Sequence, residues 1–129
     1  MRNILVTDNM RWIITDFGHD QKIMVNSLPC LNAPETSAIK TDKRIDLHGT
    51  SFTVDIWSFG IMAWEIMNLR NASTTIGISN CDAFRQGKVS IPMEKVKSIY
   101  PNMVRLDDTC LVIDPMKRAS IRDILEMLM

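Results

Sequence analysis

The longest apolar stretch of the chain is TVDIWSFGIMAWEIMNL, residues 53–69. Its apolar positions fall on all sides of a helix with 3.6 residues per turn, which is typical of a helix surrounded by protein. The stretch falls short of the roughly 20 apolar residues of a membrane span, and it contains Asp55 and Glu65. We therefore predict a buried helix over residues 53–69 that forms the core of the domain.

Two short runs near the N-terminus, residues 3–7 and 11–15, are rich in residues that favour strands. The tripeptide Asp8-Asn9-Met10 separates them, and its Asp-Asn pair favours a turn, so we predict a β-hairpin. From residue 16 to about 53 neither a helical nor an alternating period persists, apart from a short helix expected near residues 35–39. Long irregular segments within compact domains are usually functional.

The C-terminal half has the signals of several short helices. Residues 81–92 predict one that Gly87 closes, and residues 102–113 have helical periodicity that stops at Asp114-Pro115. Ser120 and Asp123 have the spacing of a capping box at the start of a last helix. The fold class is therefore mainly α, with a short β-hairpin at the N-terminus.

Composition narrows the classes of partner and compartment. The 129 residues suffice for one small domain or part of a larger one. The 15 basic and 15 acidic residues balance, which gives no electrostatic reason to expect a nucleic acid or a membrane surface as partner. The three cysteines are odd in number and form no CxxC pair, and the N-terminus lacks a secretory signal. These features favour a reduced, cytoplasmic compartment.

Several short motifs follow one another along the chain in a recognisable order. They are RNILV at residues 2–6, DFG at 16–18, APE at 33–35, DIWSFG at 55–60 and DPMKR at 114–118. In this order they resemble the C-terminal lobe of eukaryotic protein kinases, and the resemblance extends from Arg2 to Leu128. It implies a protein-kinase-like C-terminal lobe, without the rest of the kinase fold.

The resemblance also implies roles for residues near the N-terminus. Asn3 matches the asparagine that ends the catalytic loop, and Asp16 matches the DFG aspartate; in the family both hold the Mg²⁺ ions that bridge the ATP phosphates. Carboxylate and amide oxygens suit Mg²⁺, a hard cation. Phe17 is expected to pack into the core beneath the site, and Gly18 to let the backbone pivot.

Other matched residues are expected to be structural. Glu35 and Arg118 resemble the partners of a buried ion pair that ties the end of the activation segment to the helical base. Asp55 resembles a helix residue that supports the catalytic loop. Trp57 and Gly60 belong to the central helix itself.

The resemblance also divides the chain into segments. It assigns residues 1–18 to the end of the catalytic loop, the hairpin and DFG, residues 19–35 to the activation segment, residues 53–69 to the central hydrophobic helix, and residues 81–129 to the C-terminal helices. Ser27, within the activation segment, is a candidate phosphorylation site.

The chain lacks several parts of a complete kinase. Its sequence contains no HRD aspartate, glycine-rich loop or strand lysine of the family pattern. We therefore expect it to be inactive alone, with no catalytic residue of its own, and to bind Mg²⁺ and ATP poorly without a kinase N-lobe or another protein that covers the central helix.

Three functions remain open. The chain is a fragment of an active kinase that phosphorylates protein substrates, a pseudokinase-like module that binds a protein partner, or an unrelated helical protein. The last leaves the order of the motifs unexplained.

Overall fold

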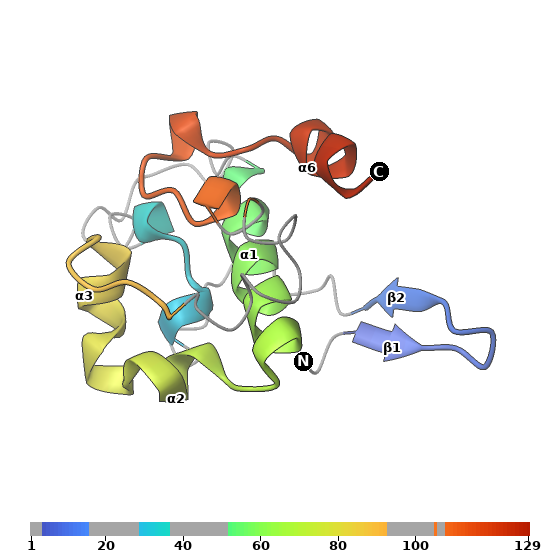
Figure 1. Ribbon diagram of the computed structural model, residues 1–129, viewed down its shortest axis with the longest axis horizontal. Coiled ribbons are helices and arrows are strands. Elements are labelled where there is room, and N and C mark those ends of the chain that lie inside the picture. The colour runs from blue at the N-terminus through green and yellow to red at the C-terminus, as the bar shows by residue number, and fades with distance from the viewer. Residues whose placement is uncertain (1–3, 16–28, 37–51, 93–104, 106–107) are drawn as a thin grey trace.

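The computed structural model describes residues 4–15, 29–36, 52–92, 105 and 108–129. Its described part is mainly helical, with one antiparallel β-hairpin (Figure 1). The predicted fold class is therefore confirmed. The helices gather around α1, while the hairpin extends away from them to one side.

The hairpin forms where the strand-favouring runs and the turn predicted it. Strand β1 (Ile4–Val6) pairs with β2 (Trp12–Ile14), and Ile4 lies opposite Ile14. Met10 has a positive φ of 60°, and its amide donates to the carbonyl of Thr7 at 2.9 Å, which closes the turn. The Thr7 hydroxyl also accepts a hydrogen bond from the amide of Arg11 at 3.1 Å.

The central helix α1 (Thr53–Asn68) coincides with the predicted buried helix. It ends at Leu69, whose φ of 51° is left-handed and whose amide donates to the carbonyl of Glu65. Its two tryptophans, Trp57 and Trp64, are 0% and 1% exposed, as the predicted core position requires. Within the described residues, no helix is long and apolar enough to cross a membrane.

Two clusters of buried side chains lie on different sides of α1. The larger joins α1 to the segment 29–36 and to the short helices that follow α1; it contains Cys30, Ala33, Trp57, Ile61, Trp64, Ala72, Ile76, Cys81, Phe84 and Ile91. The smaller joins α1 to the C-terminal part and contains Ile56, Ala63, Cys110 and Ile124. The central helix is therefore covered along two faces, which is why apolar residues surround its axis.

The remaining described elements are short. They include η1 (Pro29–Leu31), α2 (Ala72–Ile76), η4 (Ile78–Asn80), α3 (Cys81–Arg85), η5 (Pro115–Lys117) and α6 (Ile121–Leu128). Gly87 has a φ of 72° and its amide donates to the carbonyl of Phe84, so it closes α3 as predicted. The predicted capping box is present at the start of α6, with Ser120 and Asp123 bonded reciprocally.

Gly60 lies where α1 closely approaches the C-terminal part. A Cβ atom on this residue would lie 2.7 Å from the Cβ of Cys110 and 2.9 Å from a methyl carbon of Leu111. No other residue type fits without movement of these neighbours. The glycine therefore allows the backbone of α1 to contact the segment around residue 110.

The expectation of reduced cysteines is wrong for two of the three. Cys30 and Cys81 are joined by a disulfide bond, whereas Cys110 carries a thiol and is buried in the smaller cluster. The spacing of the cysteines along the chain contains no sign of this pairing, because it depends on how η1 packs against α3.

Candidate functional site

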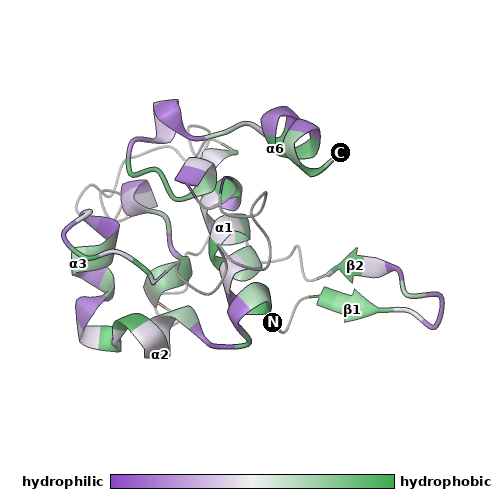
Figure 2. Cartoon of the chain, in the orientation of Figure 1, coloured by the Kyte–Doolittle hydropathy of each residue, from purple (hydrophilic) through white to green (hydrophobic). Residues whose placement is uncertain are grey.

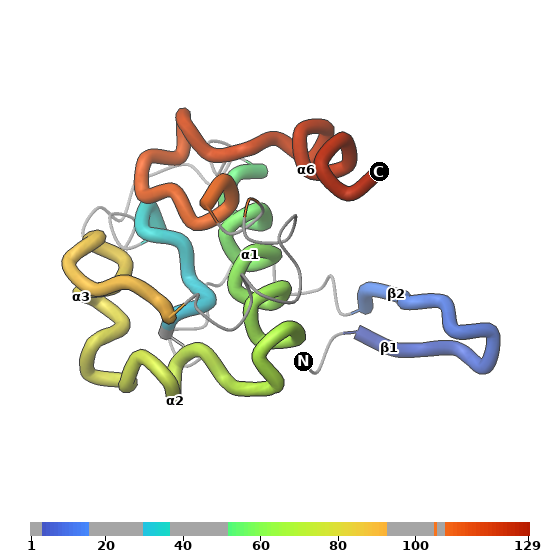
Figure 3. Tube along the Cα trace, in the orientation of Figure 1, coloured from blue at the N-terminus to red at the C-terminus, as the bar shows by residue number. Residues whose placement is uncertain are grey.

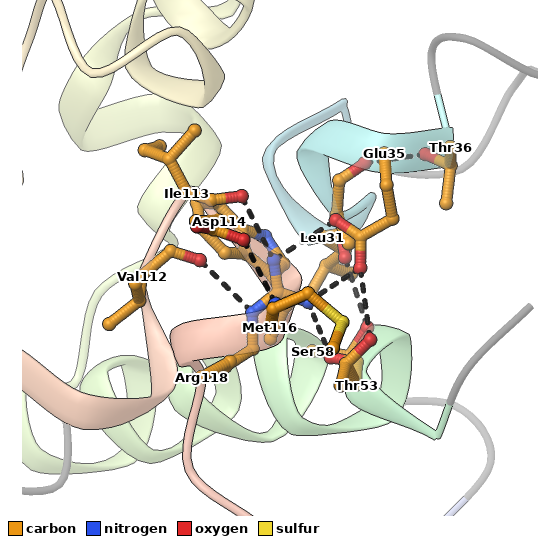
Figure 4. Close-up of polar contacts among 12 residues, drawn as sticks. Leu31, Glu35, Thr36, Thr53, Ser58, Val112, Ile113, Asp114, Met116 and Arg118 are labelled. Carbon is orange, nitrogen blue, oxygen red and sulfur yellow. Dashed lines mark hydrogen bonds and ion pairs between the residues drawn. The ribbon is translucent and has the colours of Figure 1, made fainter.

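The residues that the described structure brings together most tightly are Glu35 and Arg118, which are 83 positions apart in the sequence. Figure 4 shows Arg118 reaching from the segment after η5 toward Glu35 on the facing turn. Its Nη1 lies 2.6 Å from Oε1 of Glu35, and its Nη2 lies 3.0 Å from Oε2. The pair is thus bidentate, the strongest geometry for an arginine and a carboxylate.

Main-chain carbonyl groups occupy the other donor positions of Arg118. Its Nε donates to the carbonyl of Val112 at 3.0 Å, its Nη1 to that of Thr53 at 2.6 Å, and its Nη2 to that of Ile113 at 3.5 Å. A guanidinium group has five N–H donors, so each has an acceptor. The side chain of Arg118 is 0% exposed, and this full set of acceptors is what makes such burial tolerable.

The electrostatics of the pair follow from its partial burial. Burial raises the pKa of Glu35, but the hydrogen bonds and positive charge of Arg118 outweigh this and hold the pKa below its ordinary value. The Thr53 hydroxyl, which donates to the same carboxylate at 3.4 Å, acts in the same direction. Glu35 is therefore ionised at neutral pH, as the buried arginine requires.

The pair also connects to the central helix. The guanidinium carbon of Arg118 lies 5.3 Å from the centroid of the Trp57 ring, a cation–π distance. Trp57 in turn donates from its indole Nε1 to the carbonyl of Cys30 at 3.1 Å, and Ser58 donates to the carbonyl of Leu31 at 3.0 Å. The first turns of α1 thus hold both Arg118 and the segment that carries Glu35.

The predicted site residues divide into those that the structure describes and those that it does not. Asn3, Asp16, Phe17, Gly18 and Ser27 lie outside the described residues, and so does the part of the predicted activation segment before residue 29. Asp55 is described, in the first turn of α1, where it is exposed. The catalytic-loop segment that it was expected to support lies outside the described residues.

The hairpin lies between the two predicted magnesium ligands in the sequence. Because Ile4 pairs with Ile14, the chain enters β1 and leaves β2 at the same end of the hairpin. Paired Cα atoms of antiparallel strands lie about 4.5–5.5 Å apart. Asn3 directly precedes Ile4 in the sequence and Asp16 follows Ile14 by two residues, and both lie outside the described residues.

The residues that the structure describes contain no group of three or more histidine, cysteine, aspartate or glutamate side chains that could hold a metal ion. The predicted ligands Asn3 and Asp16 lie outside the described residues.

The sequence is similar to known kinases over nearly its full length. Residues 1–128 match the family described as "Protein tyrosine and serine/threonine kinase". The chain belongs to the protein kinase family.

Individual relatives agree with this assignment. The chain is 30% identical to "Tyrosine kinase receptor Cad96Ca" of Drosophila melanogaster over 129 residues, which is 98% of this chain and 17% of the relative. It is 29% identical to "Fibroblast growth factor receptor" of Halocynthia roretzi, with 97% of this chain and 16% of the relative covered. It is 31% identical to "Putative serine/threonine-protein kinase/receptor R818" of Acanthamoeba polyphaga mimivirus, with 95% and 7% covered. This kinase-family chain thus spans less than a fifth of the length of these relatives.

Sequence reasoning missed several groups in this kinase-family site. The carbonyl groups of Thr53, Val112 and Ile113 complete the shell of Arg118, and main-chain acceptors have no signature in residue type. The Thr53 hydroxyl also went unnoticed, although a threonine at the start of a helix is a common capping residue.

Proposed function

We propose that this chain is the lower part of a protein kinase catalytic domain that transfers the γ-phosphoryl group of Mg²⁺-ATP to a hydroxyl group of a protein. In this proposal Asn3 and Asp16 hold the Mg²⁺ ions, which neutralise charge on the phosphates. The residues described here contribute positioning: they hold the segment that ends at Glu35 against the helical base.

The observation that carries the proposal is the buried, bidentate pair of Glu35 and Arg118 with its complete set of carbonyl acceptors. Burial of an arginine side chain destabilises a fold unless each of its donors has an acceptor. The complete set of acceptors around Arg118 therefore indicates a specific junction between two segments and not a chance contact. The junction joins APE to the motif DPMKR.

Phosphoryl transfer depends on positioning and on charge stabilisation from several groups at once. The 129 residues contain no HRD motif and no glycine-rich loop. We therefore propose that they do not transfer phosphate by themselves and that activity requires the missing parts of the kinase domain.

A phosphotransfer assay tests this proposal in two forms of the protein. The 129-residue chain alone should not label a generic protein substrate with the γ-phosphate of ATP. A chimera that joins residues 1–129 to the N-lobe and catalytic loop of a related kinase should label it. In the chimera, Asp16→Asn should reduce the rate by more than the roughly 10–100-fold that loss of a supporting group costs at a metal site.

Asp20→Asn is the matched control, because it removes the same charge four residues further along. It should leave the rate within a few-fold of the unsubstituted chimera. Equal loss in both variants, or Asp16-dependent labelling by the 129-residue chain alone, would contradict the proposal.

A second candidate is a pseudokinase-like module that binds a protein partner. The observation that favours it is the hairpin, where Leu5, Trp12 and Ile14 are all more than half exposed. Figure 2 shows β1 and the end of β2 in the green of hydrophobic residues, on an element that stands apart from the helices. In this case the chimera would remain inactive, and addition of Mg²⁺-ATP would not shift the thermal unfolding of the chimera.

A further inference from the structure

The disulfide bond between Cys30 and Cys81 joins two segments that are 51 positions apart in the sequence. Their Cα atoms lie 5.2 Å apart, a usual separation for bonded cysteines. Cys30 lies in the middle of η1 and Cys81 is the first residue of α3. The bond therefore connects a helix that follows α1 to a segment that precedes it.

The segment that the bond holds is the one that carries Glu35. Figure 3 shows residues 29–36 running between α1 and α3, and η1 contacts both helices. Hydrogen bonds from Trp57 and Ser58 attach η1 to α1. The turn at residues 33–36, which contains Glu35 of the ion pair, follows η1 closely. The disulfide adds a covalent attachment of η1 to α3.

We propose that Cys30 and Cys81 form a site of reversible oxidation that controls how tightly η1 is held against α3. The bond forms by exchange with a low-molecular-weight disulfide such as glutathione disulfide. The thiolate of one cysteine attacks that disulfide, which releases one glutathione thiol and leaves a mixed disulfide. The second cysteine then attacks the protein sulfur and releases the second glutathione thiol. The two protein thiols are oxidised, the small disulfide is reduced, and the two protons end on the released glutathione thiols.

Reduction should loosen η1 without unfolding the chain. Two thiols need more room than a bonded pair, and the surrounding side chains, including Trp57 and Phe84 with ring centroids 5.5 Å apart, are closely packed. The reduced form must therefore move η1 or α3. The hydrogen bonds from α1 remain, so the reduced segment keeps a non-covalent attachment.

Burial makes the exchange slow and dependent on local opening. Cys30 and Cys81 are 0% and 1% exposed, so a reagent reaches them only when η1 or α3 moves away. Thiol exchange requires direct access of the attacking thiolate to a sulfur atom. The rate of reduction should therefore rise steeply at urea concentrations below those that unfold the whole chain.

Differential alkylation tests the bond itself. The full chain is equilibrated in buffers with different ratios of glutathione to glutathione disulfide, quenched with acid, denatured, alkylated and digested for mass spectrometry. We expect a linked peptide pair containing Cys30 and Cys81 in oxidising buffer, separate alkylated peptides in reducing buffer, and alkylated Cys110 in both. A link that includes Cys110, only intermolecular links, or alkylation of Cys30 and Cys81 at every ratio would overturn the proposal.

Amide hydrogen exchange tests what the bond does. In the unsubstituted chain, reduction should speed exchange at least tenfold in residues 29–36, with a smaller change within α6. The variants Cys30→Ser and Cys81→Ser should exchange like the reduced chain in either buffer, and Cys110→Ser should keep the redox dependence. Equal exchange in the oxidised and reduced unsubstituted chain would overturn the proposal, and this comparison needs no variant to fold.

The inference is independent of the proposed function, because neither measurement involves phosphate transfer. If the proposed function holds, the bond fixes the end of the predicted activation segment, residues 19–35. Oxidation or reduction of the two cysteines would then change how firmly this segment is held. If the chimera fails to transfer phosphate, the redox dependence of residues 29–36 is still expected.

Discussion

Trp57 and Trp12 show how differently two regions of this chain use the same residue type. Trp57, on the central helix, is 0% exposed and contacts both the ring of Phe84 and the guanidinium group of Arg118. Trp12, on the hairpin, is 61% exposed, and its neighbours Ile13 and Ile14 are exposed as well. Hydrophobicity is similar in the two places, so the difference comes from the tertiary partners that each region has within the described residues.

The comparison separates a region that is stabilised by its own packing from one that is stabilised mainly by strand pairing. A two-stranded hairpin is at best marginally stable in water by itself. The helical part is instead stabilised by two apolar clusters, a disulfide bond and the ion pair of Glu35 and Arg118, all of which lie around α1. Substitutions in the helical part should therefore change the free energy of unfolding far more than equivalent substitutions in the hairpin.

The largest effect is expected from Arg118→Met. Loss of one member of a buried ion pair leaves the other uncompensated and costs about 3–5 kcal/mol of unfolding free energy. Urea unfolding followed by far-UV circular dichroism measures this loss. Lys117→Met is the matched control, because its side chain is 78% exposed and its effect should stay within about 0.5 kcal/mol. Similar effects of both substitutions would mean that the pair contributes little.

Trp57→Phe should have a smaller but substantial effect. It leaves the carbonyl of Cys30 without its hydrogen bond from the indole, at a cost of about 1–3 kcal/mol for an unsatisfied buried group. Trp12→Phe, the same change on the hairpin, should alter the unfolding free energy by less than about 0.5 kcal/mol. Equal costs at the two positions would remove the distinction between the two regions.

Gly60→Ala tests the close contact between α1 and the C-terminal part. The added methyl group overlaps Cys110, and overpacking of this kind typically costs about 1–3 kcal/mol. Alanine is intrinsically better than glycine in a helix by about 0.8–1 kcal/mol, so a net destabilisation in urea unfolding would show that the steric cost exceeds this gain. An increase in stability would show that the contact at residue 110 relaxes freely.

Acid should weaken the junction through Glu35. Its pKa is lowered in the folded state, so its contribution to stability is present above the pKa of the unfolded chain and is lost as the pH falls through the lower, folded value. The unfolding free energy of the unsubstituted chain should therefore fall on acidification more than that of Glu35→Gln. Asp123, whose pKa is lowered by its hydrogen bonds with Ser120, contributes in the same direction. Both proteins in this comparison, with Glu35 and with Glu35→Gln, should therefore also carry Asp123→Asn.

The smallest effect on stability is expected from Ile14→Thr on the hairpin. The side chain is 65% exposed, so little apolar burial is lost and the unfolding free energy should change by less than about 0.5 kcal/mol. Its effect should appear in self-association, because exposed apolar strand edges promote contacts between molecules. Analytical ultracentrifugation should show a smaller associated fraction, whereas an unchanged fraction would exclude this strand as a contact surface.

The sequence alone determined the elements whose signals lie within a few residues of one another. The apolar run predicted α1, the Asp-Asn pair predicted the turn of the hairpin, Gly87 predicted the end of α3, and Ser120 with Asp123 predicted the start of α6. These are short-range interactions of backbone and side chain, so they can be recognised without knowledge of the fold. The order of the short motifs also indicated the kinase family.

Only the tertiary structure decided which distant groups meet. The pairing of Cys30 with Cys81, the carbonyl shell of Arg118 and the exposure of Trp12 depend on how segments many residues apart pack together. The resemblance suggested that Glu35 and Arg118 are partners. It gave no sign of the carbonyl groups that accept the other hydrogen bonds of the buried arginine. Residue type determines what a side chain can bind, whereas its burial and its partners depend on the positions of segments far away in the chain.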